Sequence, residues 1–206
     1  MKTTFHNLPL ETAPGRVFTP RPATEQLVQA ALEHIDGVPL RIADVGTGSG
    51  AIAVALAANK PNVEVWATDT NEDAVELARA NAKRLGVADR VHVLHGDLLE
   101  PLREPVDLIV ANLPYLPESQ HDSRYDDEPD DAVYAPGDDG LDTYRRLLDA
   151  CRDGKLKTGG SVLLQYDGDP YEADCWQLED LRARLEQGAV LTAPHGGRTG
   201  WARSAD

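Results

Sequence analysis

Four consecutive residues near the middle of the chain combine the groups needed to hold a planar amino group. They are Asn112, Leu113, Pro114 and Tyr115, and they directly follow the apolar run 106–111. An amide or aromatic-amine nitrogen is a poor nucleophile because its lone pair is delocalised, so a site must orient it. The Asn112 side-chain oxygen and the Leu113 carbonyl can accept its two N–H groups. Pro114 would fix the direction of that carbonyl, and Tyr115 would offer a flat packing face. A plain Asn-Pro turn after a strand is the alternative interpretation.

A second group of candidate residues lies upstream, where a glycine-rich segment follows the apolar run 41–45 and opens a helix. Its members are Asp44, Gly46, Thr47, Gly48 and Gly50. Small residues let the backbone approach a ligand, and a helix N-terminus favours negative or polar ligand groups. Asp69, at the end of the next apolar run, can accept both hydroxyl protons of a ribose. This spacing fits NAD as well as S-adenosylmethionine, and a tight strand-to-helix turn would also produce it.

Asp97 and the Asn112 motif favour S-adenosylmethionine over NAD as the cofactor. Asp97, after the run 91–94, can accept a hydrogen bond from an adenine amino group, although a helix-capping aspartate would give the same pattern. Asp44 can face the methionine ammonium, because opposite charges attract strongly in a partly dry site. Nicotinamide chemistry explains neither Asp97 nor Asn112. Together these residues predict methyl transfer from S-adenosylmethionine to a nitrogen, a reaction in which positioning alone can supply up to roughly 7–11 kcal/mol.

Strand and helix signals alternate along the chain, which predicts an α/β fold with a mostly parallel sheet covered on both faces. Apolar spacing predicts helices over residues 24–35, 51–59, 72–85, 141–151 and 174–186. Strands are expected over 41–45, 63–68, 91–94, 106–111 and 161–166, with a turn at 158–160. Segments 189–193 and 198–203 predict a C-terminal antiparallel hairpin. The candidate residues follow strands, where such sheets bind ligands.

One long acidic segment, residues 116–140, interrupts this alternation and shows no helical or strand period. A loop of this length is uncommon unless it is functional or disordered, so it is either a lid beside the site or a solvated excursion. The 206 residues suffice for one well-buried domain and not for two of ordinary size. The expected division is an N-terminal arm, residues 1–18, and one domain, residues 19–206.

Composition narrows the expected partners. The formal net charge of −15 repels phosphate backbones, so a protein, peptide or small substrate is favoured and nucleic acid is disfavoured. No apolar stretch approaches the roughly 18 residues of a membrane span, and no signal-peptide core follows the first residues, so a cytoplasmic protein is expected. Cys151 and Cys175 form no CxxC pair and are expected to be reduced thiols. The histidines are scattered, and no metal site is predicted.

Three segments resemble the class I S-adenosylmethionine-dependent methyltransferases, and among them the HemK-type protein-glutamine N5-methyltransferases that modify peptide chain release factors. They are residues 17–25, the glycine-rich segment 44–50, and the acidic block 128–147 with its Gly-Leu-Asp sequence. The resemblance implies a single Rossmann-like domain. It also implies that one set of residues binds cofactor and another holds the target amide. The first set is Gly46, Gly48, Asp69 and Asp97, and the second is Asn112, Leu113 and Tyr115.

The chain also departs from that family. The family's usual motif is Asn-Pro-Pro-Tyr, and Leu113 makes the motif similar to that of the rRNA adenine dimethyltransferases. Leucine can substitute because this residue contributes its carbonyl, so glutamine and adenine both stay open as acceptors. Bacterial members carry a helical N-terminal domain that we expect this chain to lack. Compact eukaryotic and archaeal relatives use a small zinc-binding partner instead, so a small partner subunit is also open.

The sequence therefore predicts an S-adenosylmethionine-dependent N-methyltransferase that modifies a glutamine side-chain amide of a protein such as a peptide chain release factor. Three alternatives remain. They are an adenine-N6 nucleic-acid methyltransferase, a nucleotide-binding oxidoreductase, and a noncatalytic module that binds S-adenosylmethionine.

Overall fold

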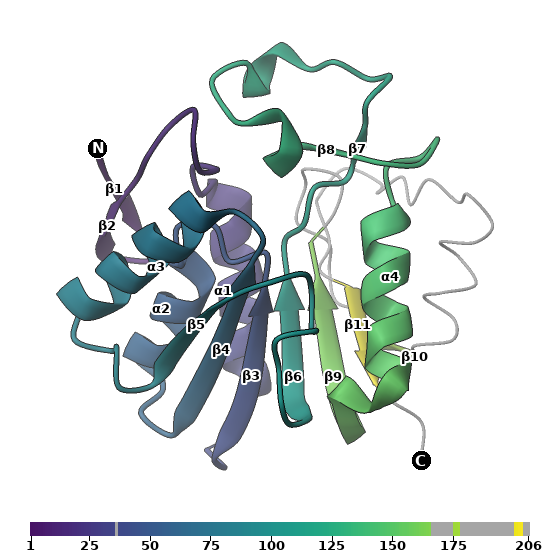
Figure 1. Cartoon of the computed structure of the whole chain (residues 1–206). Helices are drawn as coiled ribbons and strands as arrows, with labels where there is room; N and C mark the ends of the chain where they lie inside the picture. The colour runs from purple at the N-terminus through teal and green to yellow at the C-terminus, as the bar shows by residue number, and fades with distance from the viewer. Residues whose placement is uncertain (36, 166–174, 178–199, 204–206) are drawn as a thin grey trace.

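A seven-stranded sheet forms the centre of the protein, whose computed structural model describes residues 1–35, 37–165, 175–177 and 200–203 (Figure 1). Its strand order is β10–β11–β9–β6–β3–β4–β5. The bounds are β3 (Leu40–Val45), β4 (Val63–Asp69), β5 (Val91–His95), β6 (Val106–Ala111), β9 (Leu156–Leu164), β10 (Cys175–Gln177) and β11 (Gly200–Arg203). Neighbouring strands from β5 to β9 are parallel, and β11 runs antiparallel to β9. The predicted α/β class with a mostly parallel sheet is confirmed.

Helices pack on both faces of this sheet in the part of the chain that the structure describes. They are α1 (Pro22–His34), α2 (Ala51–Asn59), α3 (Glu72–Arg84) and α4 (Asp142–Ala150). Buried residues of α1, α2 and α3 belong to one apolar cluster and those of α4 to a second. Strand β6 supplies both, because Leu108 and Val110 face the first cluster while Ile109 and Ala111 face the second. This alternation places β6 at the centre of the core.

Most sequence-predicted elements agree with the structure to within two residues. The helices predicted over 24–35, 51–59, 72–85 and 141–151 correspond to α1 through α4. The first four predicted strands correspond to β3, β4, β5 and β6. The second segment of the predicted hairpin agrees with β11, while its first segment, 189–193, lies outside the described residues.

Two predictions near the C-terminus were wrong. The turn at 158–160 is part of β9, which begins at Leu156; the register shifts there, with Val106 opposite Leu156 and Leu108 opposite Ser161. Gly159 has a φ of +74°. The two glycines therefore lie in a bulge inside a strand. The sequence predicted a turn there because a bulge and a turn demand the same local backbone freedom. The predicted helix 174–186 is also wrong over Cys175–Gln177, which is β10, and its other residues lie outside the described part.

The first residues form a β-hairpin that the sequence analysis treated only as an arm. Strands β1 (Lys2–Phe5) and β2 (Leu8–Glu11) pair antiparallel around His6 and Asn7. Both turn residues have positive φ values, +47° and +62°, as a two-residue hairpin loop requires. Phe5 and Leu10 are buried in the same apolar cluster as α1, α2 and α3. The hairpin is thus packed against the core, while the division into an arm and a domain stays a prediction.

The acidic segment 116–140 contains short regular elements. Strands β7 (Leu116–Pro117) and β8 (Tyr134–Ala135) pair in parallel, and two 3₁₀ turns lie between them, η1 (Ser123–Tyr125) and η2 (Asp130–Ala132). Figure 1 shows this segment across the end of the sheet at which β6 terminates. Among the helices that the structure describes, none is long and apolar enough to cross a membrane.

Candidate functional site

A cavity of about 950 Å³ lies at the carboxyl ends of the parallel strands. It is lined by nearly all of the residues selected from the sequence. The glycine-rich segment and the ends of the next two strands contribute Gly46, Thr47, Gly48, Asp69 and Asp97. The segment after β6 contributes Asn112, Leu113, Pro114 and Tyr115. The structure therefore brings together two groups of residues that the sequence analysis selected for different tasks. Asp44 and Gly50 do not line the cavity.

The glycines of residues 46–50 permit close packing as well as tight turns. A Cβ atom added to Gly50 would lie 3.0 Å from the backbone of Ala78, so α3 approaches the start of α2 directly. A Cβ atom on Gly46 would lie 2.6 Å from Cδ2 of Leu113. Both glycines also have positive φ values, +79° and +70°. Gly50 thus sets the position of the loop against α3, while Gly46 brings the loop against the segment after β6.

Asp44 lies below this loop. It is fully buried, and its Oδ2 accepts hydrogen bonds from Thr47 Oγ1 at 2.6 Å and from the Ala53 N–H at 3.0 Å. Its Oδ1 has no hydrogen-bond partner, and burial raises the pKa of this carboxyl to about 7. Asp44 is still inside β3, so its side chain is directed at the start of α2. The two bonds of its Oδ2 show that Asp44 supports the loop, and the contact with a methionine ammonium expected from the sequence stays a prediction.

Asp69 closes the other side of the loop, at the end of β4. Its Oδ2 accepts the Gly48 N–H at 2.8 Å and its Oδ1 accepts the Asn71 N–H at 2.9 Å. Burial is the main cause that raises its pKa, and the nearby charge of Asp131 adds to it. A carboxylate offers about four acceptor positions, so two bonds leave room for two ribose hydroxyls. The geometry suits the role predicted from the sequence.

Asp97 forms an ion pair that the sequence analysis did not predict. Its carboxylate contacts the guanidinium of Arg146 from α4, and both residues line the cavity. No helix of the described chain begins at Asp97, so the helix-capping alternative is not supported. Arg146 was missed because only the tertiary fold brings α4 beside the end of β5.

Asn112 lies half-buried immediately after β6. Its Nδ2 donates to Thr24 Oγ1 of α1 at 3.4 Å. With the NH2 end of the amide directed at α1, the side-chain oxygen is the end available to an N–H donor. The next residue, Leu113, donates its backbone N–H to the hydroxyl of Tyr144 at 3.0 Å. The two acceptors expected to hold a planar amino group thus come from a segment that is held at both residues.

Two segments meet over the cavity and are joined by an ion pair. Glu128 of the acidic segment is buried; its Oε2 accepts the Thr19 N–H and its Oε1 accepts from Arg21, each at 2.9 Å. The Arg21 guanidinium also lies 5.6 Å from the ring of Phe18 and 5.5 Å from that of Tyr125. Residues of both segments line the cavity. The acidic segment therefore lies beside the site, as the lid interpretation requires, and is bonded to residues ahead of α1.

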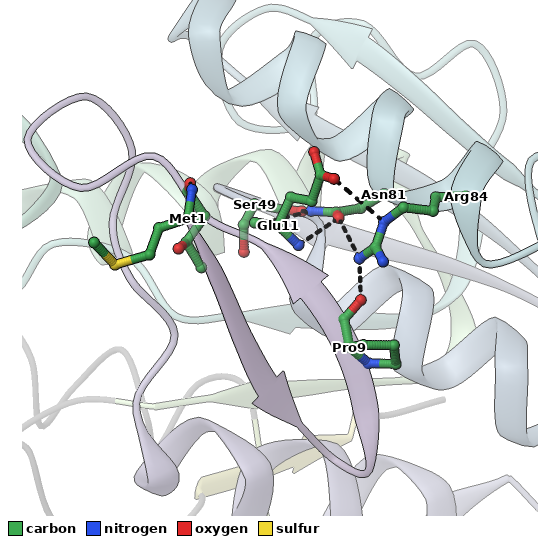
Figure 2. Close-up of polar contacts among 7 residues, drawn as sticks. Met1, Pro9, Glu11, Ser49, Asn81 and Arg84 are labelled. Atoms are coloured by element: carbon green, nitrogen blue, oxygen red, sulfur yellow. Dashed lines mark hydrogen bonds and ion pairs between the residues drawn. The ribbon is translucent and has the colours of Figure 1, made fainter.

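A buried amide holds the glycine loop from behind. Figure 2 shows Asn81 of α3 between strand β2 and Ser49. Its Nδ2 donates to the carbonyls of Ser49 at 2.8 Å and Glu11 at 3.0 Å, and its Oδ1 accepts the Glu11 N–H at 2.9 Å. Asn81 and its bond to the Ser49 carbonyl are buried, so water cannot readily replace the side chain at that carbonyl. Asn81 joins the N-terminal hairpin to the loop, a role for which a single asparagine in a helix gave no sequence signal.

Comparison with known proteins gives both sequence and structural matches. Residues 20–126 match the family model of the methyltransferase small domain. The release factor glutamine methyltransferase of Moorella thermoacetica is 42% identical over 82% of this chain and 60% of its own length. The protein of that name from Deinococcus radiodurans is 44% identical over 76% of this chain and 56% of its own length. The chain thus spans about three fifths of the length of the curated relatives it matches.

Solved structures share the fold. A ribosomal protein L11 methylase from Lactobacillus delbrueckii subsp. bulgaricus has a TM-score of 0.59 at 24% identity, covering 93% of this chain and 83% of its own. The 16S rRNA N2 G1207 methyltransferase of T. thermophilus, solved with AdoMet and guanosine, has a TM-score of 0.59 at 18% identity, covering 82% and 42%. At such low identity these likenesses establish the Rossmann-like architecture and nothing about the substrate.

Proposed function

The chain belongs to the methyltransferase small domain family, and from that premise we propose that it transfers a methyl group from S-adenosylmethionine to a glutamine side-chain amide of a protein. The acceptor we favour is a peptide chain release factor. Support comes from relatives named release factor glutamine methyltransferase, which agree with the resemblance noted in the sequence. Because these relatives are longer than this chain, its activity and its substrate are proposals. Action on a release factor would place the protein in the cytoplasm.

The residues present fit the proposed cofactor. The cavity volume of about 950 Å³ is within the range of about 300–1,000 Å³ typical of small-molecule sites. Asp69 would accept the ribose hydroxyls, the glycines at 46 and 48 would let the backbone approach the ligand, and Asp97, which also lines the cavity, would accept the adenine amino group. When bound, S-adenosylmethionine supplies a methyl group on a positively charged sulfur.

One observation carries the proposed reaction: Asn112 and Leu113 line the same cavity as the glycine loop and Asp69. The Asn112 Oδ1 and the Leu113 carbonyl would accept the two N–H groups of the target amide and orient its nitrogen. Tyr115 would pack against the flat amide. In transfer, the amide nitrogen would exchange one N–H proton, released to water, for the methyl group that S-adenosylmethionine supplies. Asn112 and Leu113 would orient the nitrogen, so that no strong base is needed before attack.

Adenine is the second candidate acceptor. Leu113 replaces the usual proline of the glutamine-modifying motif, and an adenine amino group is also planar with two N–H groups. The net charge of −15 argues against a nucleic acid, since it repels the phosphate backbone. We therefore favour a protein acceptor over a nucleic acid. The proposal also includes a small partner subunit that takes part in the reaction.

The test is a methyl-transfer assay with radiolabelled S-adenosylmethionine. A peptide containing Gly-Gly-Gln and the intact release factor are compared with rRNA and duplex DNA, and a Gly-Gly-Glu peptide serves as the matched control because it lacks the target NH2 group. We expect label on the glutamine-containing substrates alone. Label on RNA or DNA alone would favour adenine, whereas calorimetric binding of S-adenosylhomocysteine without transfer to any acceptor, with and without host extract, would support the noncatalytic module. Binding of NAD(H) instead would support the oxidoreductase.

A further inference from the structure

A single buried hydroxyl lies under the segment that would hold the acceptor. It belongs to Tyr144 of α4, whose residue surface is 1% exposed. The Leu113 N–H donates to this oxygen at 3.0 Å, and the Leu113 carbonyl lies 3.3 Å from it. The hydroxyl also makes a short contact with the carbonyl of Gln165, the residue after β9. One side chain thus contacts the ends of two neighbouring strands.

The proton of that hydroxyl can serve only one acceptor at a time. The hydroxyl accepts the Leu113 N–H, and the carbonyls of Leu113 and Gln165 both lie within reach of its proton. A carbonyl oxygen has two lone pairs, so the Leu113 carbonyl can accept from the hydroxyl and still accept an N–H group of a ligand in the cavity.

The contacts also restrict the backbone of Leu113 on both sides of its Cα atom. The N–H belongs to the peptide group that precedes Leu113, and the carbonyl belongs to the group that follows it. Pro114 already limits the conformations of the residue before it. The strand ends themselves are joined, because the Gln165 N–H donates to the Ala111 carbonyl at 3.0 Å. Tyr144 therefore fixes the direction of the acceptor carbonyl against a rigid part of the sheet.

We propose that Tyr144 is a positioning residue for methyl transfer, whose hydroxyl aims the Leu113 carbonyl at the target amide. The inference rests on the proposed function and adds to it a residue 31 positions along the chain from the motif. It acts through Leu113 and touches neither donor nor acceptor. Its predicted effect is on the rate of transfer, since the cofactor loop is held by Asp69 and Asn81.

The first measurement uses Tyr144→Phe, which keeps the ring in the apolar cluster and removes the hydroxyl. We expect kcat to fall by at least about tenfold, while the dissociation constant for S-adenosylhomocysteine, measured by calorimetry, stays the same. Leu148→Val is the matched control. Leu148 is on the same helix and buried in the same cluster, so this change weakens the packing without altering the hydroxyl. It should lower Tm and leave kcat unchanged.

A second measurement does not depend on activity. Amide hydrogen exchange, resolved at Leu113 by NMR, should be faster in Tyr144→Phe than in wild type and in Leu148→Val. If exchange at Leu113 is faster in Tyr144→Phe but the wild type methylates no acceptor, the proposed function is refuted and the contact between Tyr144 and Leu113 is retained. Unchanged exchange at Leu113, or a kcat loss in Leu148→Val as large as that in Tyr144→Phe, would overturn the positioning role.

Discussion

The two sides of the cavity are built in different ways. On the cofactor side, backbone groups of the glycine loop bond to side chains of neighbouring elements. The Gly48 N–H donates to Asp69 at the end of β4, 21 positions along the chain, and the Ser49 carbonyl accepts from Asn81 of α3, 32 positions along it. On the acceptor side, side chains connect distant segments. Leu113 is bonded to Tyr144 over 31 positions, Asn112 to Thr24 over 88, and Arg21 to Glu128 over 107.

This difference separates binding from transfer. A loop made of backbone groups keeps its shape when a side chain on the opposite wall is changed, so cofactor affinity should be insensitive to the acceptor side. The acceptor side depends on a few oriented polar groups, such as the Asn112 side chain and the Leu113 carbonyl. Mutations on the two sides should therefore divide into those that change the dissociation constant of the cofactor and those that change kcat.

The largest effect is expected from Asn112→Ala. The change removes one acceptor for the target N–H groups, and loss of one preorganised group of this kind typically lowers kcat by about 10²–10³-fold. The dissociation constant for S-adenosylhomocysteine should stay the same, because Asn112 bonds to α1 and not to the glycine loop. Radiolabel transfer and calorimetry on the same preparation test both statements. Full activity in the variant would remove Asn112 from the mechanism.

Asp69→Ala should act on the cofactor side of the cavity and lower the affinity for the cofactor. It removes the expected ribose acceptor and the bond that holds the Gly48 N–H, so the dissociation constant for S-adenosylmethionine should rise by at least about tenfold, or about 1.4 kcal/mol. Asp73→Ala is the control, since that side chain is 43% exposed and pairs with Arg16 outside the cavity. Equal affinities in the two variants, measured by calorimetry, would contradict the role of Asp69.

An intermediate effect is expected from Asn81→Ala. The change leaves the buried Ser49 carbonyl and the partly buried backbone of Glu11 without this partner, which should lower the free energy of unfolding by about 1–3 kcal/mol. Cofactor affinity should fall several-fold because the loop loses its support. Asn59→Ala, an exposed asparagine on α2, should change neither quantity in urea unfolding and calorimetry. A destabilised variant with unaltered cofactor affinity would show that hairpin and loop are independent.

The smallest effect on activity is expected from Asp44→Asn. This substitution should mainly change how the stability of the protein depends on pH. Burial raises the pKa of Asp44 from its ordinary value of 3.8 to about 7, so between these values the folded protein holds a proton that the unfolded chain releases. The stability linked to this carboxyl is complete below 3.8 and is lost as pH rises to about 7. The neutral asparagine should remove that loss, so Tm of wild type should decline relative to the variant across this window. Parallel Tm profiles would show that Asp44 does not titrate there.

The sequence was sufficient for the helices and strands between residues 22 and 150 that carry a clear apolar pattern, and for the residues at strand ends. The run 106–111 agrees with β6 at both ends, and 51–59 agrees with α2, because these segments carry an unambiguous apolar pattern. Asp69, Asp97 and Asn112 could be grouped in advance, since parallel strands end at one edge of the sheet. Such predictions need only local pattern and one rule of topology.

The sequence was not sufficient where a partner lies far along the chain. Tyr144 and Asn81 look like ordinary helix residues until the fold places their polar atoms beside Leu113 and Ser49. The bulge at Gly159 could not be distinguished from a turn, because both need the same backbone freedom. The missed residues are thus those whose role is a tertiary hydrogen bond, and Arg146 beside Asp97 belongs with them.

The contact between Leu113 and Gly46 has a consequence for engineering. The leucine side chain occupies the space that any larger residue at position 46 would need, as the 2.6 Å distance to a built Cβ atom shows. Residues 46 and 113 must therefore be compatible with each other. A chimera that takes its glycine loop from one relative and residues 112–115 from another must match these two positions. Saturation of one position in the background of the other would reveal compatible pairs, and activity would follow the pair instead of either residue alone.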